Sequence, residues 1–213
     1  MTRRSTSLGR ADWITVARAT LITKGIEGVK IERLAGILGV TIGSFYWHFT
    51  TRGDLLEALL VDWVQGNSRP FYTAVETAGP TAAARFAAIT QMFIEETDYS
   101  PGYDIAVRDW ARNDPKVART VRRIDGRRIS LLKRIFRDFG YSEGEAFIRA
   151  RVTYFHQMGY YSMRVQETQE QRLAYAPLYL EILAGPKAPA FDSIVTRKPI
   201  GMMRAGGRNV ERK

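Results

Sequence analysis

Cysteine is absent from this 213-residue chain, and histidine occurs only twice, as His48 and His156. The lack of cysteine excludes disulfides, thiolate metal sites and cysteine nucleophiles. The two histidines are far apart in sequence, so no metal site and no cofactor are predicted. No apolar run approaches the roughly 18 residues of a membrane span. The start of the chain is polar and basic and lacks the apolar core of a signal peptide. We therefore expect a cytoplasmic protein that makes no membrane contact.

The segment between Gly39 and Phe49 carries the strongest functional signal. Gly39 can adopt the left-handed conformation of a tight turn between two helices, and Thr41 can cap the helix that follows. Phe45 and Phe49 are four residues apart, so they share one helix face and can enter a small core. The other aromatic side chains then point away from that core, as they do on a helix that meets bases and phosphates. The pattern predicts the second helix of a helix-turn-helix.

The residues on either side extend this pattern. Apolar residues recur at helical spacing before Gly25 and again before Gly39, and each glycine is a stop signal. Residues 51–54 have the form of a capping box, so a further helix is expected there. The complete pattern consists of Trp13, Ala17, Gly25, Leu34, Ala35, Gly39, Val40, residues 45–49 and Leu55. Over about residues 10–60 it closely resembles the N-terminal domain of the TetR family of bacterial transcriptional regulators.

The resemblance implies an all-α fold of about nine helices. An N-terminal three-helix helix-turn-helix DNA-binding domain is expected over residues 1–65, followed by a C-terminal helical ligand-binding and dimerisation domain over residues 66–185. A basic, mobile tail is expected over residues 186–213. Glycine and proline cluster in residues 66–80, which indicates a junction between the two domains.

Capping and stop signals divide the second domain into helices. They are expected at about residues 81–96, 103–113, 115–139, 142–166 and 169–184. The helix over 142–166 is apolar or small on most sides from Val152 to Met163, so it needs cover on two faces. One face can meet its own domain and the other a second subunit. This helix and the helix over 169–184 therefore predict a homodimer that packs as a four-helix bundle. A monomer with an apolar surface is the alternative.

The resemblance also implies which residues meet double-stranded DNA. They are Lys30, Thr41, Ile42, Gly43, Ser44, Tyr46, Trp47, His48 and Arg52. Tyr46, His48 and Arg52 are assigned to phosphates, which fix register without reading sequence. Lys30 stands where the family usually has a capping Ser or Thr; it cannot cap the helix, but its ammonium can reach a phosphate.

Base reading is expected to depend on apolar contacts. No Lys or Arg lies between Val40 and Thr51, so this helix has no bidentate contact to guanine. We therefore predict contacts from Ile42 and Trp47 to thymine methyl groups. Two alternatives stay open: Trp47 packs against the fourth helix, or His48 is an ordinary capping or surface residue.

TetR-like proteins usually hold a small-molecule pocket in the C-terminal helices, and the ligand releases the operator. The resemblance thus implies a repressor that binds a palindromic operator as a homodimer and responds to an unidentified small-molecule effector. Candidate pocket residues are aromatic residues and methionines, because these form adaptable apolar pockets: Met92, Phe93, Tyr103, Trp110, Tyr154, Phe155 and Met158. Plain core packing is the alternative for each. His156 and Trp110 offer polar groups to a ligand.

Charge is unevenly distributed along the chain. The net charge is +10, but residues 1–65 hold eight basic and six acidic residues, and residues 116–137 hold nine basic residues and one Asp. The basic helix suggests an anionic ligand or a second DNA contact, although a solvated face with ion pairs to Asp125 and Asp138 is the favoured interpretation. A charge-driven, nonspecific or architectural DNA-binding protein is the alternative function. No phosphate loop, catalytic triad or carboxylate pair indicates an enzyme.

Overall fold

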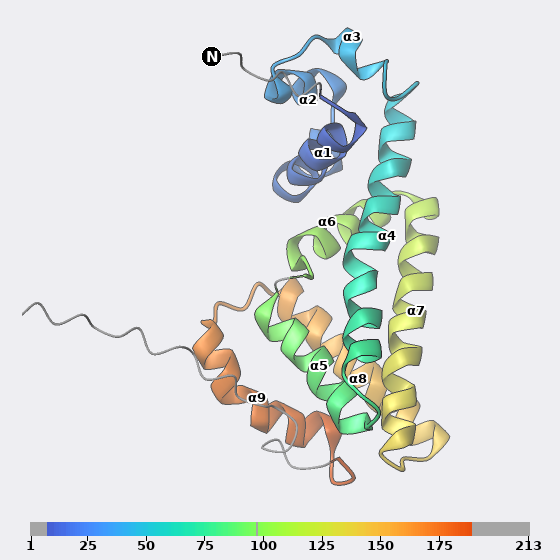
Figure 1. Ribbon diagram of the computed structural model, residues 1–213, viewed down its shortest axis with the longest axis vertical. Coiled ribbons are helices and arrows are strands. Elements are labelled where there is room, and N and C mark those ends of the chain that lie inside the picture. Colours follow the sequence, from blue (N-terminus) through green and yellow to red (C-terminus); the bar gives the residue numbers. More distant parts are fainter. Residues whose placement is uncertain (1–7, 97, 189–213) are drawn as a thin grey trace, which may run out of the picture.

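The computed structural model describes residues 8–96 and 98–188, and every regular element within them is helical (Figure 1). The α-helices are α1 Arg10–Lys24, α2 Ile31–Leu38, α3 Ile42–Phe45, α4 Arg52–Thr77, α5 Ala82–Glu95, α6 Pro101–Ala111, α7 Pro115–Asp138, α8 Glu143–Ser162 and α9 Gln169–Ala184. A short 3-10 turn, Ile26–Gly28, joins α1 to α2. The predicted all-α fold is confirmed. Most of the expected basic tail lies outside the described residues.

Local sequence signals position most helix ends. Gly39 ends α2 with φ 68° and ψ 31°, the left-handed conformation that the turn before α3 requires. Capping boxes begin α4, α8 and α9, where the side chains of Thr51, Ser142 and Thr168 each accept a hydrogen bond from a backbone N–H three residues on. These short-range signals are read correctly from the sequence because each involves residues that are adjacent on one helical turn.

Helices α1, α2, α3 and the start of α4 form the N-terminal head. Its core is aromatic: the Phe45 ring meets Trp13 edge-on at 5.2 Å and stacks on Phe49 at 5.4 Å between ring centroids. Phe45 and Phe49 are both buried, as their spacing predicts. Offset and edge-on aromatic pairs add to the stabilisation that burial provides. A short α3 is thereby fixed to the head through a single face.

Helix α4 runs without a break through the segment predicted to be a domain junction. Gly66 and Pro70 lie inside it, and it ends only at Thr77. Proline removes a backbone hydrogen bond, but burial of Phe71 and a reciprocal pair of hydrogen bonds between Asn67 and the backbone of Ser100 hold the helix in place. The segment expected to join the two domains is therefore largely helical, because tertiary packing outweighs the local glycine and proline signal.

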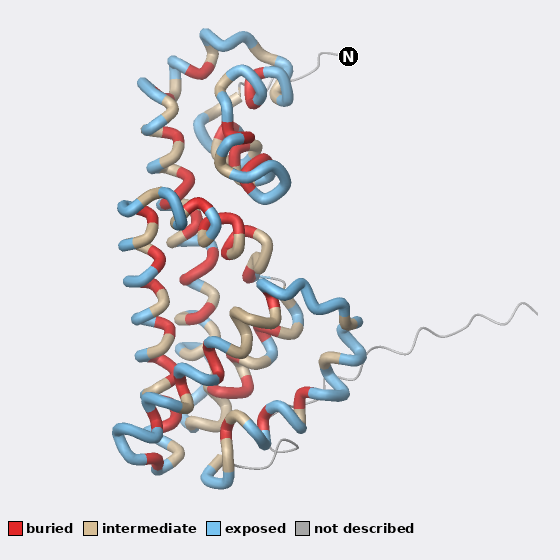
Figure 2. The backbone as a smooth tube through the Cα atoms, turned by 180° about the vertical axis from the view of Figure 1, so that it is seen from behind, coloured by how far each residue is buried: buried red, intermediate tan, exposed pale blue. Residues whose placement is uncertain are grey.

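Two apolar cores lie along α4, and Figure 2 places the buried residues along the inner sides of the helices. The first joins the head to α6 and to the start of α7, through residues such as Trp63, Val107 and Val121. The second joins the lower part of α4 to α5, α7, α8 and α9, around Phe71 and Phe136. Among the helices that the structure describes, none has the length and apolar character needed to cross a membrane.

Candidate nucleic-acid interface and ligand pocket

The segment from α3 to the start of α4 forms the tip of the head (Figure 1). Because Phe45 and Phe49 take the inward positions, the intervening residues are turned outward. Trp47 is 87% exposed, and Tyr46 and Ile42 are also exposed. Trp47 therefore does not pack against α4, and the structure contradicts that alternative. An indole that is almost wholly exposed to solvent contributes little to the stability of the fold. Such exposure is expected of a side chain that contacts a partner.

The small residues of this segment leave its surface open. A Cβ atom at Gly43 would meet only Thr41 Oγ1, at 3.7 Å, so internal packing does not require glycine there. Thr41 precedes α3 in an extended conformation, but its side chain makes no capping hydrogen bond, contrary to expectation. Its exposed hydroxyl remains available to an external acceptor or donor, and Ser44 is half-buried beside it.

The cationic residues assigned to phosphates differ in their surroundings. Lys30 precedes α2, is exposed and makes no capping hydrogen bond, so its ammonium is free to reach outward. Arg52 instead points into the head: its Nε donates to the carbonyl oxygen of Val29 at 2.6 Å, and its Nη2 donates to that of Ile26 at 3.0 Å. Arg52 thus braces the turn between α1 and α2, and these bonds direct its guanidinium away from the expected phosphate contact. His48 is half-buried beside Arg10.

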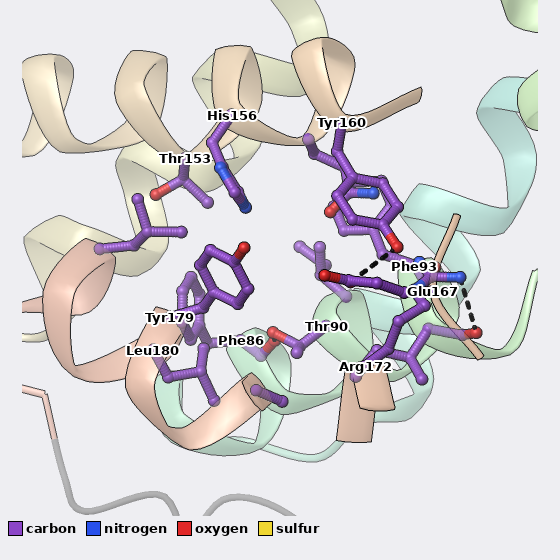
Figure 3. A pocket seen from close by; sticks show the side chains of 15 residues that line it. Phe86, Thr90, Phe93, Thr153, His156, Tyr160, Glu167, Arg172, Tyr179 and Leu180 are labelled. Atoms are coloured by element: carbon purple, nitrogen blue, oxygen red, sulfur yellow. Dashed lines mark hydrogen bonds between the residues drawn. The ribbon is translucent and has the colours of Figure 1, made fainter. Parts of the chain in front are cut away.

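A cavity of about 80 Å³ lies between α5, α8 and α9. Figure 3 shows side chains from all three helices converging on it. The walls are mainly apolar and aromatic, with a few polar groups from α8. The lining residues are Phe86, Ile89, Thr90, Phe93, Ile94, Thr153, His156, Gln157, Tyr160, Glu167, Arg172, Ala176, Tyr179, Leu180 and Leu183. An apolar cavity with few convergent polar groups is the usual form of a small-molecule site.

Three polar side chains of α8 face this cavity without strong internal partners. The Oγ1 of Thr153 is buried and has no hydrogen-bond partner in the protein. The Nε2 of Gln157 is also buried and makes no hydrogen bond of ordinary geometry, although the Tyr161 hydroxyl lies near it. His156 lies against the ring of Tyr179, with 4.6 Å between ring centroids. Burial lowers the pKa of His156 below its ordinary value, although Glu167 opposes this effect, so the imidazole is neutral at neutral pH. Unpaired buried polar groups are uncommon in a finished core.

The ionised groups at the cavity are already engaged. Arg172 Nη1 bonds to Glu96 Oε1 at 2.7 Å and to the carbonyl oxygen of Ile94, and its Nη2 bonds to the carbonyl oxygen of Phe93. Tyr160 donates its hydroxyl to Glu167 at 3.0 Å. Burial and that hydrogen bond raise the pKa of Tyr160 to about 12, so the phenol stays protonated. Among the described residues that line the cavity, no cation is unpaired.

Only one of the seven predicted pocket residues, Phe93, lines this cavity. The other six lie elsewhere. Tyr103 and Trp110 belong to the core beneath the head, Tyr154 is hydrogen-bonded to charged residues of other helices, and Phe155 is half exposed. Met92 faces a groove between α4 and α5, and Met158 packs against the second core. Residue type alone did not distinguish pocket-lining residues from core residues, because aromatic residues and methionine occur in both.

A better signal was present on α8. Polar residues at positions 153, 156, 157 and 160 follow the i, i+3, i+4, i+7 spacing of a single helix face. Such a polar stripe inside an otherwise apolar helix is unusual in a core and indicates a cavity or a partner. His156 was considered as a ligand contact; Thr153, Gln157 and Tyr160 were missed.

A buried network of charged residues links α6, α7 and α8. Arg128 and Asp104 are 0% and 1% exposed, with 3.2 Å between Arg128 Nη1 and Asp104 Oδ1. Arg108 bonds to Asp104 at 2.7 Å and, through both terminal nitrogens, to Asp125. The Tyr154 hydroxyl donates to Asp125 at 2.7 Å and accepts from both arginines. Burial alone would raise the pKa of Asp104, but Arg128 and Arg108 outweigh it and hold that pKa below its ordinary value.

The network also reaches α4, which carries the head. Trp63 Nε1 donates to Asp104 Oδ1 at 3.2 Å, and Arg128 Nη2 donates to the carbonyl oxygen of Asn67 at 2.8 Å. Helix α8 contributes Tyr154 to this network and lines the cavity with neighbouring residues. Tyr154 of α8 is thus connected to α4 through Arg128, which bonds to the carbonyl oxygen of Asn67.

Ion pairs connect α7 to several neighbouring helices. Asp125 pairs with Arg108 of α6, and Asp138 pairs with Arg85 of α5. Lys133 and Arg137 both pair with Glu143 at the start of α8. The expected ion pairs of Asp125 and Asp138 are thus present, but they join helices and do not lie within α7. Surface pairs of this kind contribute little to stability.

Helices α8 and α9 expose a row of large apolar side chains. Ile148, Val152 and Phe155 follow one face of α8, and Leu178 and Ile182 follow one face of α9; all are at least half exposed. Ile182 and Val152 line the same shallow groove between the two helices. A continuous apolar surface on two adjacent helices is typical of a protein interface. We call these five residues the α8–α9 face.

The N-terminal part of the chain matches a known family. Residues 14–59 match the model of "Bacterial regulatory proteins, tetR family". Within the curated proteins, the chain is 35% identical over 51 residues to the HTH-type transcriptional regulator TtgR of Pseudomonas putida, and the same holds for the probable regulator ArpR of that species. The match spans about a quarter of the length of these relatives, 24% of each.

Solved structures extend the likeness to the C-terminal helices. The TetR-family regulator SCO4454 of Streptomyces coelicolor has a TM-score of 0.68 at 20% identity, with 82% of this chain and 93% of that chain covered. The reduced form of NemR from E. coli has a TM-score of 0.62 at 17% identity, with 78% and 95% covered. At this identity, the likeness establishes the fold.

Residues 14–59 thus carry the helix-turn-helix domain of the TetR family of DNA-binding regulators, and the chain as a whole shares its fold with solved TetR-family regulators. This family comprises regulators and not enzymes. Among the described residues, no group of His, Asp or Glu has the arrangement of a metal site.

Proposed function

We propose that the chain is a repressor that binds a palindromic operator as a homodimer and is released from it by a small molecule. The observation that carries this proposal is the outward-facing segment of α3 and the following turn. Its apolar and aromatic side chains are exposed although the residues on either side anchor it in a rigid core. That combination suits a helix that inserts into the major groove.

The proposed DNA contacts are of two kinds: contacts to phosphates fix the position of the head on the duplex, and contacts to bases read the sequence. The Lys30 ammonium, the Tyr46 hydroxyl and a ring N–H of His48 bind phosphates. These contacts fix the position of the head on the duplex. Ile42 and Trp47 approach thymine methyl groups, which carry sequence information in the major groove. Thr41, Gly43 and Ser44 allow close approach of the backbone to the base edges.

The homodimer is proposed to form through the α8–α9 face. A two-fold arrangement of α8 and α9 gives a four-helix bundle and covers the exposed apolar residues. It also holds two heads at a fixed separation, so each head reads one half of a palindrome. The two-fold symmetry of the proposed dimer therefore requires a DNA site with the same two-fold symmetry.

Release is proposed to begin at the cavity between α5, α8 and α9. A ligand there contacts α8 directly, and Tyr154 on α8 is hydrogen-bonded to Asp125, Arg108 and Arg128. Asp104 and Arg128 in turn bond to α4. A ligand that favours a shifted α8 therefore favours a different position of the head, which is the thermodynamic requirement for coupling between the two sites.

Selection of bound duplexes from a random DNA library at near-physiological salt tests the proposed function. We expect enrichment of a two-fold palindrome with half-sites about one helical turn apart or at a multiple of it. Binding without an enriched motif, with a steep dependence on salt, would support the charge-driven, nonspecific or architectural alternative.

The substitution Trp47→Ala is expected to weaken binding to the selected palindrome by about 10- to 100-fold, because one apolar base contact is lost in each head. The free energy of unfolding should change by less than about 0.5 kcal/mol, since an exposed side chain contributes little to the fold. Fluorescence anisotropy and urea denaturation measure the two quantities. Ile37→Ala, an exposed residue on α2, is the control. Equal affinities for Trp47→Ala and the unsubstituted protein would place base reading elsewhere.

A further inference from the structure

The charged side chains around the cavity limit which ligands it can bind. Arg172 is committed to Glu96 and to two backbone carbonyl groups, and Glu167 accepts from Tyr160. Counting Arg172, Glu96 and Glu167, with His156 neutral, the ionised side chains at the cavity sum to one negative charge. An anionic ligand would enter an apolar site without an unpaired cation, and burial of an unpaired charge is strongly unfavourable.

The unpaired polar groups bear on what the ligand must carry. Thr153 is only 8% exposed, and its hydroxyl has no partner within the protein. The Nε2 of Gln157, one helical turn further along α8, is likewise buried and makes no hydrogen bond of ordinary geometry. Both can donate a hydrogen bond, and Nε2 can do nothing else. A ligand with an acceptor atom would satisfy them, whereas a purely hydrocarbon ligand would leave both unsatisfied.

The apolar walls and the small volume complete the description. Four aromatic rings, from Phe86, Phe93, Tyr160 and Tyr179, surround the cavity (Figure 3). The volume of about 80 Å³ is below the several hundred Å³ of a typical ligand site, so the walls of the cavity must part to admit a ring system. Few residues of α9 are buried, namely Ala176, Leu180 and Ala184, and Arg172 joins the start of α9 to α5 through the carbonyl groups of Ile94 and Phe93.

We propose that the effector is a neutral, largely apolar molecule with a hydrogen-bond acceptor such as a carbonyl oxygen, bound by the side chains of Thr153 and Gln157. This inference rests on the proposed function, because it assumes that the cavity is the effector site. It excludes the anionic ligand that the basic composition of α7 suggested, since the basic side chains of α7 do not line the cavity.

Four probes that share one ring system separate the possibilities: 2-acetylnaphthalene, naphthalene, 2-naphthoate and 2-naphthylmethylammonium. Isothermal titration calorimetry on the full chain measures each dissociation constant. We expect 2-acetylnaphthalene to bind at least about tenfold more tightly than 2-naphthoate and the ammonium probe, and more tightly than naphthalene. Tighter binding of either charged probe would overturn the inference.

Two matched substitutions locate the bound probe. Thr153→Val removes only the unpaired hydroxyl, so we expect about three- to tenfold weaker binding of 2-acetylnaphthalene, no change for naphthalene and no loss of stability. Thr90→Val is the control, because Thr90 lines the same cavity but donates its hydroxyl to the carbonyl oxygen of Phe86 on its own helix. Equal effects of the two substitutions on 2-acetylnaphthalene binding would contradict the role of Thr153.

The same experiment distinguishes failure of this inference from failure of the proposed function. Preferred binding of 2-naphthoate that depends on a cavity residue would leave an effector site in place and refute only the ligand class. Failure of all four probes to bind would refute the cavity as an effector site. The selection of operator DNA is carried out without ligand, so its outcome depends neither on the ligand class nor on the cavity being the effector site.

Discussion

Replacing Ile182 by glutamate is expected to convert the proposed dimer into monomers and to weaken binding to the proposed palindromic operator by at least about 100-fold. Ile182 is 75% exposed on α9, beside Val152 of α8 in the α8–α9 face. A carboxylate at the centre of a covered apolar surface would lose its hydration without gaining a partner, so association becomes unfavourable. A monomer then engages one half-site at a time and loses the binding energy of the other.

Sedimentation equilibrium gives the oligomeric state, and anisotropy with a labelled duplex gives the affinity. Val61→Glu is the control for the oligomeric state, because Val61 is exposed on α4, outside the α8–α9 face. The control protein should remain dimeric. A dimer that survives Ile182→Glu with unchanged affinity would show that the two-fold interface lies on another surface.

Replacing Asp104 by asparagine is expected to lower the free energy of unfolding by about 3–5 kcal/mol. The substitution preserves the shape of the side chain but leaves the positive charge of Arg128 buried without its anion. Removal of one member of a buried ion pair is strongly destabilising because the other charge keeps its full desolvation penalty. Urea denaturation with equal slopes for the two proteins measures the difference.

Asp109→Asn on the same helix is the matched control. Asp109 pairs with Arg112 at the surface, where both side chains are mostly exposed, so the expected loss is below about 1 kcal/mol. Similar losses for the two substitutions would mean that the Arg128–Asp104 pair is not a major source of stability.

The same carboxyl group predicts how stability depends on pH. The pKa of Asp104 is held below its ordinary value in the folded state, so its contribution is complete above the pKa of an unfolded aspartate. That contribution is lost as the pH falls through the lower, folded value. We therefore expect acid to destabilise the unsubstituted protein more than the Asp104→Asn protein over this range, which urea denaturation at a series of acidic pH values measures.

Some features were predictable from the sequence because the residues that cause them are close together in it. The capping boxes at Thr51, Ser142 and Thr168 and the left-handed Gly39 each depend on fewer than about six consecutive residues. The outward position of Trp47 followed from two inward phenylalanines at helical spacing. For such features, local backbone geometry alone determines the outcome.

The remaining features depend on residues that are distant in sequence. Asp104 and Arg128 are separated by 24 positions, and nothing near either one indicates that they pair. Arg52 was assigned outward because of its position in the motif, but carbonyl groups more than 20 residues earlier turn it inward. The pocket was missed for the same reason, since its walls come from three helices whose relative placement only the fold defines.

Because α4 is continuous, a small tilt at one of its ends produces a larger displacement at the other end. Its 26 residues, at 1.5 Å each, form a rod about 39 Å long with the head at one end and the second core at the other. A tilt of about 5° at the lower end displaces the upper end by about 3 Å. In a two-fold pair the rods tilt in opposite senses, so the two heads separate by about twice that distance, or roughly two base-pair steps. In the proposed dimer, a modest tilt of α4 would thus become a linear change large enough to put both heads out of phase with the DNA helix.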